Sequence, residues 1–353
     1  MPRHPCYAMP MMAAAVSVPK DRRRWITVWL WTSLISIFAM VVIGGMTRLT
    51  ESGLSITEWR PLIGALPPIT EADWQDLFQL YRQSPEFQKK NFGIDLAEFK
   101  TIFWWEYAHR LWGRMIGIIY GVPLVVFWWR GWFGPALARR FLVIFCLGGL
   151  QGVVGWWMVA SGLVDRPEVS VYRLTVHLCL AFLVAALILW TLCDLAGMAL
   201  PAPLSARRAA WLVLGLVSVT VIAGALVAGN DAGLVYNSFP LMDGHLVPPD
   251  YFRPDIEPLW RNLFESHAAV QLHHRVLALA TLAAILWFGW VHRRHPALVR
   301  PATLLALMAL VQVGLGIATL LLGVPIALGV LHQAGAFILF LLAVWMAHAA
   351  QCE

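Results

Sequence analysis

Four histidines inside long apolar segments are the residues of this sequence best suited to chemistry. They are His109, His177, His274 and His332, and each lies within about two helical turns of the same end of its apolar run. An ionisable side chain inside a bilayer is costly, so each one is a candidate functional group. One such histidine alone could equally be a buried imidazole bonded to a backbone carbonyl. Four at equal depth predict two facing pairs.

Paired imidazoles indicate a haem site more than a zinc site. Zinc prefers four clustered nitrogen or sulfur ligands, and no cysteine or carboxylate completes such a set here. A haem iron needs one axial ligand on each face, and the interior of a helical bundle commonly holds cofactors. We therefore expect two haem sites, with His109 facing His177 and His274 facing His332.

Arginines near the histidines are candidates for binding haem carboxylates. Arg110 and Arg275 each directly follow a histidine, at the end of a span where a propionate would emerge. The alternative is that each snorkels to the interface or pairs locally. Arg48 is a weaker candidate of the same kind.

Glu106 distinguishes the first pair of histidines from the second. It precedes His109 by three residues and so shares its helix face, whereas Gln271 has the same offset from His274. A carboxylate can take a proton or stabilise a developing cation beside a haem, which an amide cannot. The first half is therefore the candidate catalytic half. The alternative is that Glu106 forms a structural ion pair with Arg110.

The elements that must position these residues are membrane-spanning helices. The chain has 353 residues, of which 59% are hydrophobic and only 13% are charged. This composition excludes an ordinary soluble domain, and the basic residues lie between apolar runs, which argues against nucleic-acid binding. A spanning helix needs about 20 apolar residues. Eight runs qualify, at about 25–45, 107–129, 140–160, 173–193, 209–229, 270–291, 302–322 and 326–348.

Arginine clusters predict the orientation of these spans. Lys and Arg near span ends are retained on the cytoplasmic side. If the spans alternate, one side collects Arg22–Arg24, Arg130, Arg139, Arg140, Arg207, Arg208, Arg293, Arg294 and Arg300. We therefore expect a multi-pass protein of the inner (cytoplasmic) membrane with both termini cytoplasmic and the histidines toward the periplasm.

Weak internal duplication divides the chain into two halves. The loop sequence Ser52-Gly53-Leu54 resembles Ala232-Gly233-Leu234, and Gln151 and Gln312 occupy matching positions in the third and seventh spans. Both halves begin on the same side, which is typical of parallel repeats. The predicted fold is all-α, with eight transmembrane helices in two parallel-repeat four-helix bundles. The predicted parts are a cytoplasmic tail at 1–24, an N-terminal half at 25–195 and a C-terminal half at 196–349.

Four stretches of the chain are similar to those of the heme A synthase family, membrane enzymes that oxidise a methyl group of heme O to a formyl group. They are residues 44–55 (GGMTRLTESGLS), 59–61 (WRP), 106–114 (EYAHRLWGR) and 271–275 (QLHHR). The resemblance runs from the first span to the last. It implies an oxidoreductase that makes heme A for terminal oxidase assembly.

The resemblance also assigns roles to the candidate residues. It implies that His274 and His332 bind the iron of a resident haem b, and that His109 and His177 mark the site of the substrate, heme O. Glu106 is then the essential carboxylate beside that substrate. Arg110 and Arg48 are expected to bind the substrate, and Arg275 the resident haem. The implied partners are heme O synthase (a farnesyltransferase), an electron donor and the lipid bilayer, with a homo-oligomer as an option and no nucleic acid.

Three alternatives stay open on the sequence alone. A di-haem b-type electron carrier that acts as a quinol oxidoreductase would hold both haems without altering them. A haem exporter or chaperone would exchange haem without changing it. His273 precedes His274 directly and could be the axial ligand in its place, although His274 aligns with His109 before an arginine.

Overall fold

Eight long apolar helices make up most of the chain, as predicted. The computed structural model describes residues 18–59, 63–164, 167–198 and 201–351, so the predicted tail lies mostly outside the described residues. The described ranges contain no β-strand, and the chain is an all-α, multi-pass membrane protein. The spanning helices are α1 (Lys20–Leu49), α4 (Leu96–Trp129), α5 (Pro135–Ala160), α6 (Val171–Ala196), α7 (Leu204–Gly229), α9 (His267–Val291), α10 (Val299–Leu321) and α11 (Ile326–Ala349).

Proline and glycine mark several ends of these helices. Pro203 and Pro325 immediately precede α7 and α11, and Pro135 is the first residue of α5. Proline suits the start of a helix because the backbone N–H groups there have no carbonyl partner within the helix, so the N–H that proline lacks is not missed. Gly197 follows α6 with a φ of 64°, a left-handed conformation that glycine adopts without steric cost.

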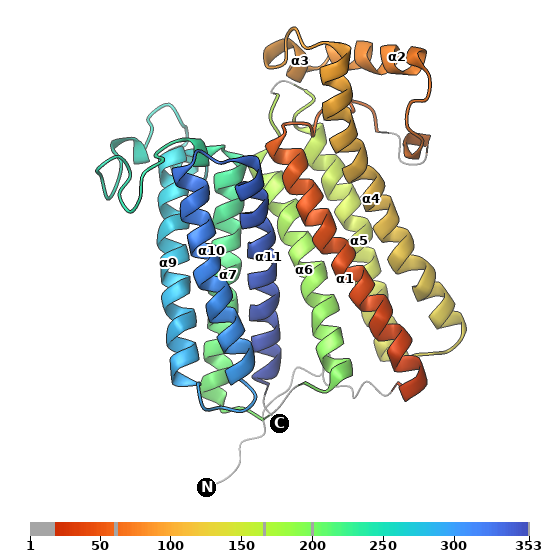
Figure 1. Ribbon diagram of the computed structural model, residues 1–353, viewed down its shortest axis with the longest axis vertical. Coiled ribbons are helices and arrows are strands. Elements are labelled where there is room, and N and C mark those ends of the chain that lie inside the picture. Colours follow the sequence, from red (N-terminus) through yellow and green to blue (C-terminus); the bar gives the residue numbers. More distant parts are fainter. Residues whose placement is uncertain (1–17, 60–62, 165–166, 199–200, 352–353) are drawn as a thin grey trace.

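The helices pack in pairs, and the pairs form two groups. The most extensive packing joins α1 to α4, α5 to α6, α7 to α9 and α10 to α11. Figure 1 shows α7, α9, α10 and α11 on one side and α1, α4, α5 and α6 on the other. The groups meet where α1 packs on α11 and α6 packs on both α7 and α11. At this junction Phe182 of α6 lies edge-on to Phe337 of α11, with ring centroids 5.1 Å apart. This arrangement is compatible with two four-helix bundles.

Helix α4 is longer than the predicted span at 107–129, because it begins at Leu96. Asp95 and Glu98 form a capping box that starts the helix early. Its first turns project beyond the other spans, beside the short helices α2 (Glu71–Arg82) and α3 (Pro85–Lys89) (Figure 1). Aromatic side chains of α2 and α4 pack together there, with Trp74 and Phe103 4.9 Å apart between ring centroids. These turns are thus buried against the loop helices that link α1 to α4.

The outer segment between α7 and α9 contains only short helices. These are η2 (Ala232–Leu234), η3 (Pro249–Tyr251), η4 (Leu259–Arg261) and α8 (Asn262–Glu265). The buried Asn262 organises the segment, because its amide donates to the carbonyls of Arg253, Ile256 and Leu259.

A polar cluster joins three helices at the end of the molecule where α1 begins and α11 ends (Figure 1). Arg140 of α5 donates to Asp194 of α6 at 2.5 Å, and Nε2 of His348 in α11 lies 2.8 Å from the other carboxylate oxygen. The His348 side chain is 1% exposed. Asp194 therefore links the two groups of helices at the end opposite the four histidines.

Candidate functional site

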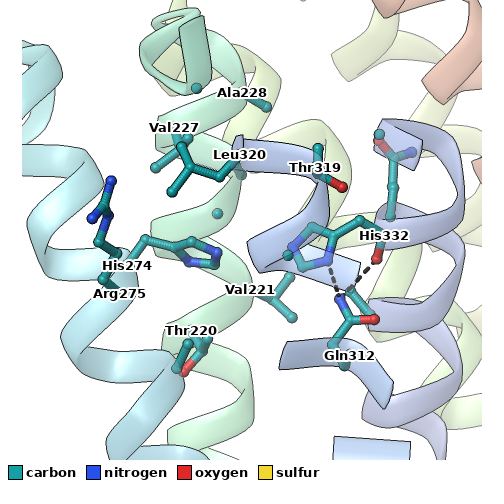
Figure 2. Close-up of a pocket in the computed structure, with 18 of the residues that line it drawn as sticks. Thr220, Val221, Val227, Ala228, His274, Arg275, Gln312, Thr319, Leu320 and His332 are labelled. Atoms are coloured by element: carbon teal, nitrogen blue, oxygen red, sulfur yellow. Dashed lines mark hydrogen bonds between the residues drawn. The ribbon is translucent and has the colours of Figure 1, made fainter. Parts of the chain in front are cut away.

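A cavity of about 390 Å³ lies between α7, α9, α10 and α11. This volume is within the usual range of ligand and cofactor pockets. His274 and His332 line the cavity, together with mostly apolar side chains of the four helices (Figure 2). Leu178 and Phe182 of α6 and Arg48 of α1 also contribute to the lining, so the cavity reaches the other group of helices.

The imidazoles of His274 and His332 point toward one another across this cavity (Figure 2). Their ring centroids are 6.3 Å apart and their planes are nearly perpendicular, at 84°. A metal ion bound by imidazole lies about 2 Å from the nitrogen, so two rings on opposite sides of one ion have centroids roughly 6 Å apart. The spacing fits a metal ion between the rings, and the mostly apolar lining suits an apolar macrocycle around it.

A glutamine of α10 holds the backbone of the histidine on α11. The side-chain Nε2 of Gln312 donates to the backbone carbonyl of His332 at 2.8 Å and lies 3.1 Å from Nδ1 of the ring. An imidazole that binds a metal through Nε2 carries a proton on Nδ1, so Gln312 holds this residue through its bond to the backbone carbonyl. The sequence showed Gln312 only as one member of a repeat, because its contact with His332 depends on how α10 packs on α11.

The other two histidines have a similar setting in the first group of helices. His109 lies in α4 and His177 in α6, and both are half-buried. Gln151 of α5 donates to the backbone carbonyl of His177 at 2.9 Å and lies 3.3 Å from its Nδ1. Thus Gln151 relates to His177 as Gln312 does to His332.

Arg275 borders the cavity beside His274. One end of its guanidinium donates to Gln271 at 2.6 Å and to the backbone carbonyl of Tyr236 at 2.8 Å. Its Nε is buried and has no hydrogen-bond partner among the described residues. A buried guanidinium N–H without a partner is unfavourable, and an acidic ligand group in the cavity would satisfy it.

Arg48 lines the same cavity, although its sequence position is nearer to the His109 motif. It forms an ion pair with Asp231 at 2.6 Å and donates to the carbonyl of Ala228 at 2.9 Å. Its Nε is also buried without a partner among the residues that the structure describes. The packing of α1 on α11 brings Arg48 to the second half of the chain.

Glu106 is fully hydrogen-bonded in the structure. It is 3% exposed, and its Oε1 accepts from Arg110 at 2.6 Å. Its Oε2 accepts from the hydroxyl of Ser55 and the backbone N–H of Ile56, both at 2.7 Å. Arg110 in turn donates to the Ile56 carbonyl at 2.8 Å. The ion pair considered as the structural alternative is therefore present.

Gln271 occupies the position that corresponds to Glu106, but it donates to its loop where Glu106 accepts from its own. Its Oε1 accepts from Arg275, as Glu106 accepts from Arg110. Its Nε2 donates to the backbone carbonyls of Ala232 and Val235, at 2.6 and 2.5 Å. The loop after α1 thus presents donors to a carboxylate, whereas the loop after α7 presents acceptors to an amide.

His273 lies in a different environment from His274. Its Nε2 is 2.6 Å from the hydroxyl of Tyr251, in the outer segment. His274, by contrast, lines the cavity opposite His332. The geometry favours His274 as the ligand.

Glu86 is a buried carboxyl group outside the spanning helices. It lies in α3 and is 3% exposed, and its Oε2 has no hydrogen-bond partner among the described residues. Burial raises the pKa of Glu86 to about 7, against the smaller lowering effects of the Tyr81 hydroxyl and Lys90. The negative charges of Glu106 and Glu51 also raise this pKa.

Eight spanning helices, four of which enclose a cavity lined by two facing imidazoles, define a polytopic membrane protein. A family model described as cytochrome oxidase assembly protein, COX15-CtaA, matches residues 27–344. The chain belongs to this family.

Several relatives are similar to the chain over nearly its whole length. The heme A synthase of Nitrosospira multiformis is 48% identical over 332 residues, which cover 92% of each chain. The heme A synthase of Rhodopseudomonas palustris strain TIE-1 is 49% identical over 336 residues, or 94% of this chain and 90% of its own. That of Parvibaculum lavamentivorans is 49% identical over 321 residues, or 91% and 92%.

Proposed function

We propose that this protein is a heme A synthase, an oxidoreductase that converts heme O to heme A by oxidising a porphyrin methyl group to a formyl group. The relatives named heme A synthase support this reaction. The structural observation that carries the proposal is the facing of His274 and His332 across an apolar cavity at 6.3 Å between ring centroids. Product heme A would serve terminal oxidase assembly, in keeping with the family's description.

In this proposal His274 and His332 hold a resident haem b in the second half of the chain. The spacing of the rings and the apolar lining support the assignment. Arg275 and Arg48 would bind the propionates, because each has a buried Nε without a partner and each borders the cavity. When bound, this haem supplies one-electron redox chemistry. Assigning Arg48 to the resident haem changes its expected role from substrate binding.

The substrate heme O would bind in the first half, between His109 and His177. The matching positions of Gln151 and Gln312 on their histidines support a second site of the same design. Arg110 contacts Glu106 and the loop after α1, so its first role there is to hold these groups in place. The predicted substrate-binding role of Arg110 would require its guanidinium to reach a propionate as well.

The carboxylate of Glu106 would accept a proton released during the oxidation of the methyl group. Of its three donors, Arg110 and the Ile56 N–H cannot accept a proton, whereas the Ser55 hydroxyl can both donate and accept. Ser55 lies 2.7 Å from Oε2 of Glu106 and 3.5 Å from the carbonyl of Ile102, so its proton has an alternative acceptor. Of the three, the hydroxyl of Ser55 is therefore the one that can rotate to accept a hydrogen bond when Oε2 is protonated.

The arginine clusters of the sequence support an orientation of the protein in the membrane. We place the protein in the cytoplasmic membrane, with both termini cytoplasmic and the haem sites toward the periplasm. Helix α1 begins and α11 ends at the same end of the molecule, which supports placing both termini on one side of the membrane (Figure 1). The N-terminal half would be catalytic and the C-terminal half would hold the resident haem. Heme O synthase, an electron donor and a second copy of the chain are the proposed partners.

An inventory of the porphyrins in purified protein tests the proposal. The protein should be expressed with a supply of heme O and its pigments identified by optical spectra and mass. A heme A synthase yields heme A together with haem b. An electron carrier, exporter or chaperone returns the porphyrin it was given, and that result would overturn the proposed reaction.

A further inference from the structure

The imidazole of each of the four histidines lies against a glycine. That glycine belongs to the neighbouring helix that packs on the helix of the histidine. A Cβ built on any of these glycines would meet Cε1 of the imidazole at 3.1 Å or less, whereas ordinary contact begins near 3.4 Å. The four distances are 3.1 Å for Gly44 and His109, 2.9 Å for Gly155 and His177, 3.0 Å for Gly224 and His274, and 2.8 Å for Gly316 and His332.

These contacts repeat in register between the two halves. Gly44 lies in α1 and Gly224 in α7, eight residues before the matching Ser52 and Ala232. On the other two helices, Gly155 follows Gln151 by four residues and Gly316 follows Gln312 by four. Glycine and glutamine thus lie one turn apart on the same helix face and contact the same imidazole.

Other glycines of the same helices lack such contacts. A Cβ on Gly152 of α5, Gly215 of α7 or Gly314 of α10 would have nothing within 4 Å. On α4, a Cβ on Gly113 or Gly121 would meet a methionine or a phenylalanine side chain. Close approach to an imidazole is therefore specific to the four positions and is not a general property of glycine in these helices.

We propose that Gly44, Gly155, Gly224 and Gly316 are positioning residues that fix where each imidazole lies in its site. This inference rests on the proposed function. An added methyl group would displace the ring by a few tenths of an ångström from its present position. An iron–nitrogen bond of about 2 Å does not tolerate such a shift, so axial ligation weakens or the ring tilts.

The resident site offers a matched test on one helix. Gly316→Ala and the control Gly314→Ala add the same methyl group two residues apart in α10, and only the first contacts His332. The readouts are the haem-to-protein ratio, the low-spin electron paramagnetic resonance signal and the midpoint potential of the resident haem. We expect Gly316→Ala to shift the low-spin signal and to weaken haem retention by about tenfold or more. Gly314→Ala should match the unsubstituted protein.

The substrate site offers the same comparison on α5. Gly155→Ala should slow heme A formation and leave the low-spin signal of the resident haem unchanged, because Gly155 contacts His177 alone among the four histidines. Gly152→Ala is its control. A loss of both signals in Gly155→Ala would indicate general misfolding and would overturn the assignment of Gly155.

The outcomes separate this inference from the proposed function. If the unsubstituted protein shows no bis-imidazole signal, the proposed haem site is wrong. If that signal is present and Gly316→Ala matches Gly314→Ala, the positioning role of the glycines is wrong. Should Gly316→Ala fail to accumulate, Gly224→Ala decides, because its Cβ would lie 3.0 Å from the ring of His274. A signal in Gly224→Ala identical to that of its control, Gly215→Ala, would overturn the inference.

Discussion

Replacing Glu106 with glutamine separates its chemical role from its structural one. The carboxylate accepts three hydrogen bonds, from Arg110, Ser55 and Ile56. A glutamine has one oxygen and an NH2 group, so it can accept from one side while its NH2 faces donors on the other. The Ser55 hydroxyl can rotate and accept, but the backbone N–H of Ile56 or the guanidinium of Arg110 loses its acceptor.

The expected cost in stability is moderate. One buried donor without a partner costs about 1–3 kcal/mol, which is a fraction of the stability of a typical folded protein. We therefore expect Glu106→Gln to fold and to keep the resident haem spectrum. Its rate of heme A formation should fall by about 100-fold or more, because an amide cannot perform acid–base catalysis.

Pigment extraction and unfolding measurements on the same preparation check both parts. Ser55→Ala is the graded control, because it removes one donor and leaves the carboxylate of Glu106 in place. It should slow conversion less than Glu106→Gln does. Unimpaired conversion in Glu106→Gln would refute the catalytic role. Loss of conversion together with loss of the resident haem would refute the separation of the two roles.

The remaining predictions concern the resident haem and the stability of the two ends of the molecule. Alanine in place of His274 or His332 should abolish the low-spin haem spectrum, and a persisting spectrum in both variants would contradict the ligand assignment. Asp194→Ala leaves the half-buried Arg140 without its carboxylate and should lower the free energy of unfolding by about 1–3 kcal/mol, measured with denaturant; an unchanged value would show that the cluster is not stabilising. Glu86 has a folded pKa of about 7 against a usual value of 4.5, so its contribution to stability is full below pH 4.5 and is lost as pH rises through 7. Glu86→Gln should remove this pH dependence, which is on the order of 3 kcal/mol, and a dependence that survives the substitution must come from another group.

The sequence was sufficient to predict the spans and two facing histidines. Apolar runs of about 20 residues have few alternatives to spanning helices. The facing of His274 and His332 followed from equal depth on helices of one bundle, since side chains at one level of a bundle can meet. Their cavity and 6.3 Å spacing agree with that reasoning.

Contacts between distant segments could not be predicted in the same way. The early start of α4 depends on aromatic packing against α2, and Arg48 reaches Asp231 only because α1 packs on α11. The loop donors around Glu106 follow from loop backbone geometry, which hydropathy does not encode. The glycines under the imidazoles were visible as small residues, but only the helix pairing shows which of them meet a ring.

Helix α1 belongs to both halves of the molecule at once. Gly44 lies against the ring of His109. Arg48, one turn further along α1, lines the cavity that contains His274 and His332. These two residues are about 6 Å apart along a rigid helix. A tilt or rotation of α1 would therefore change the packing around His109 and the lining of the cavity at the same time. A substitution that moves this helix would affect both places.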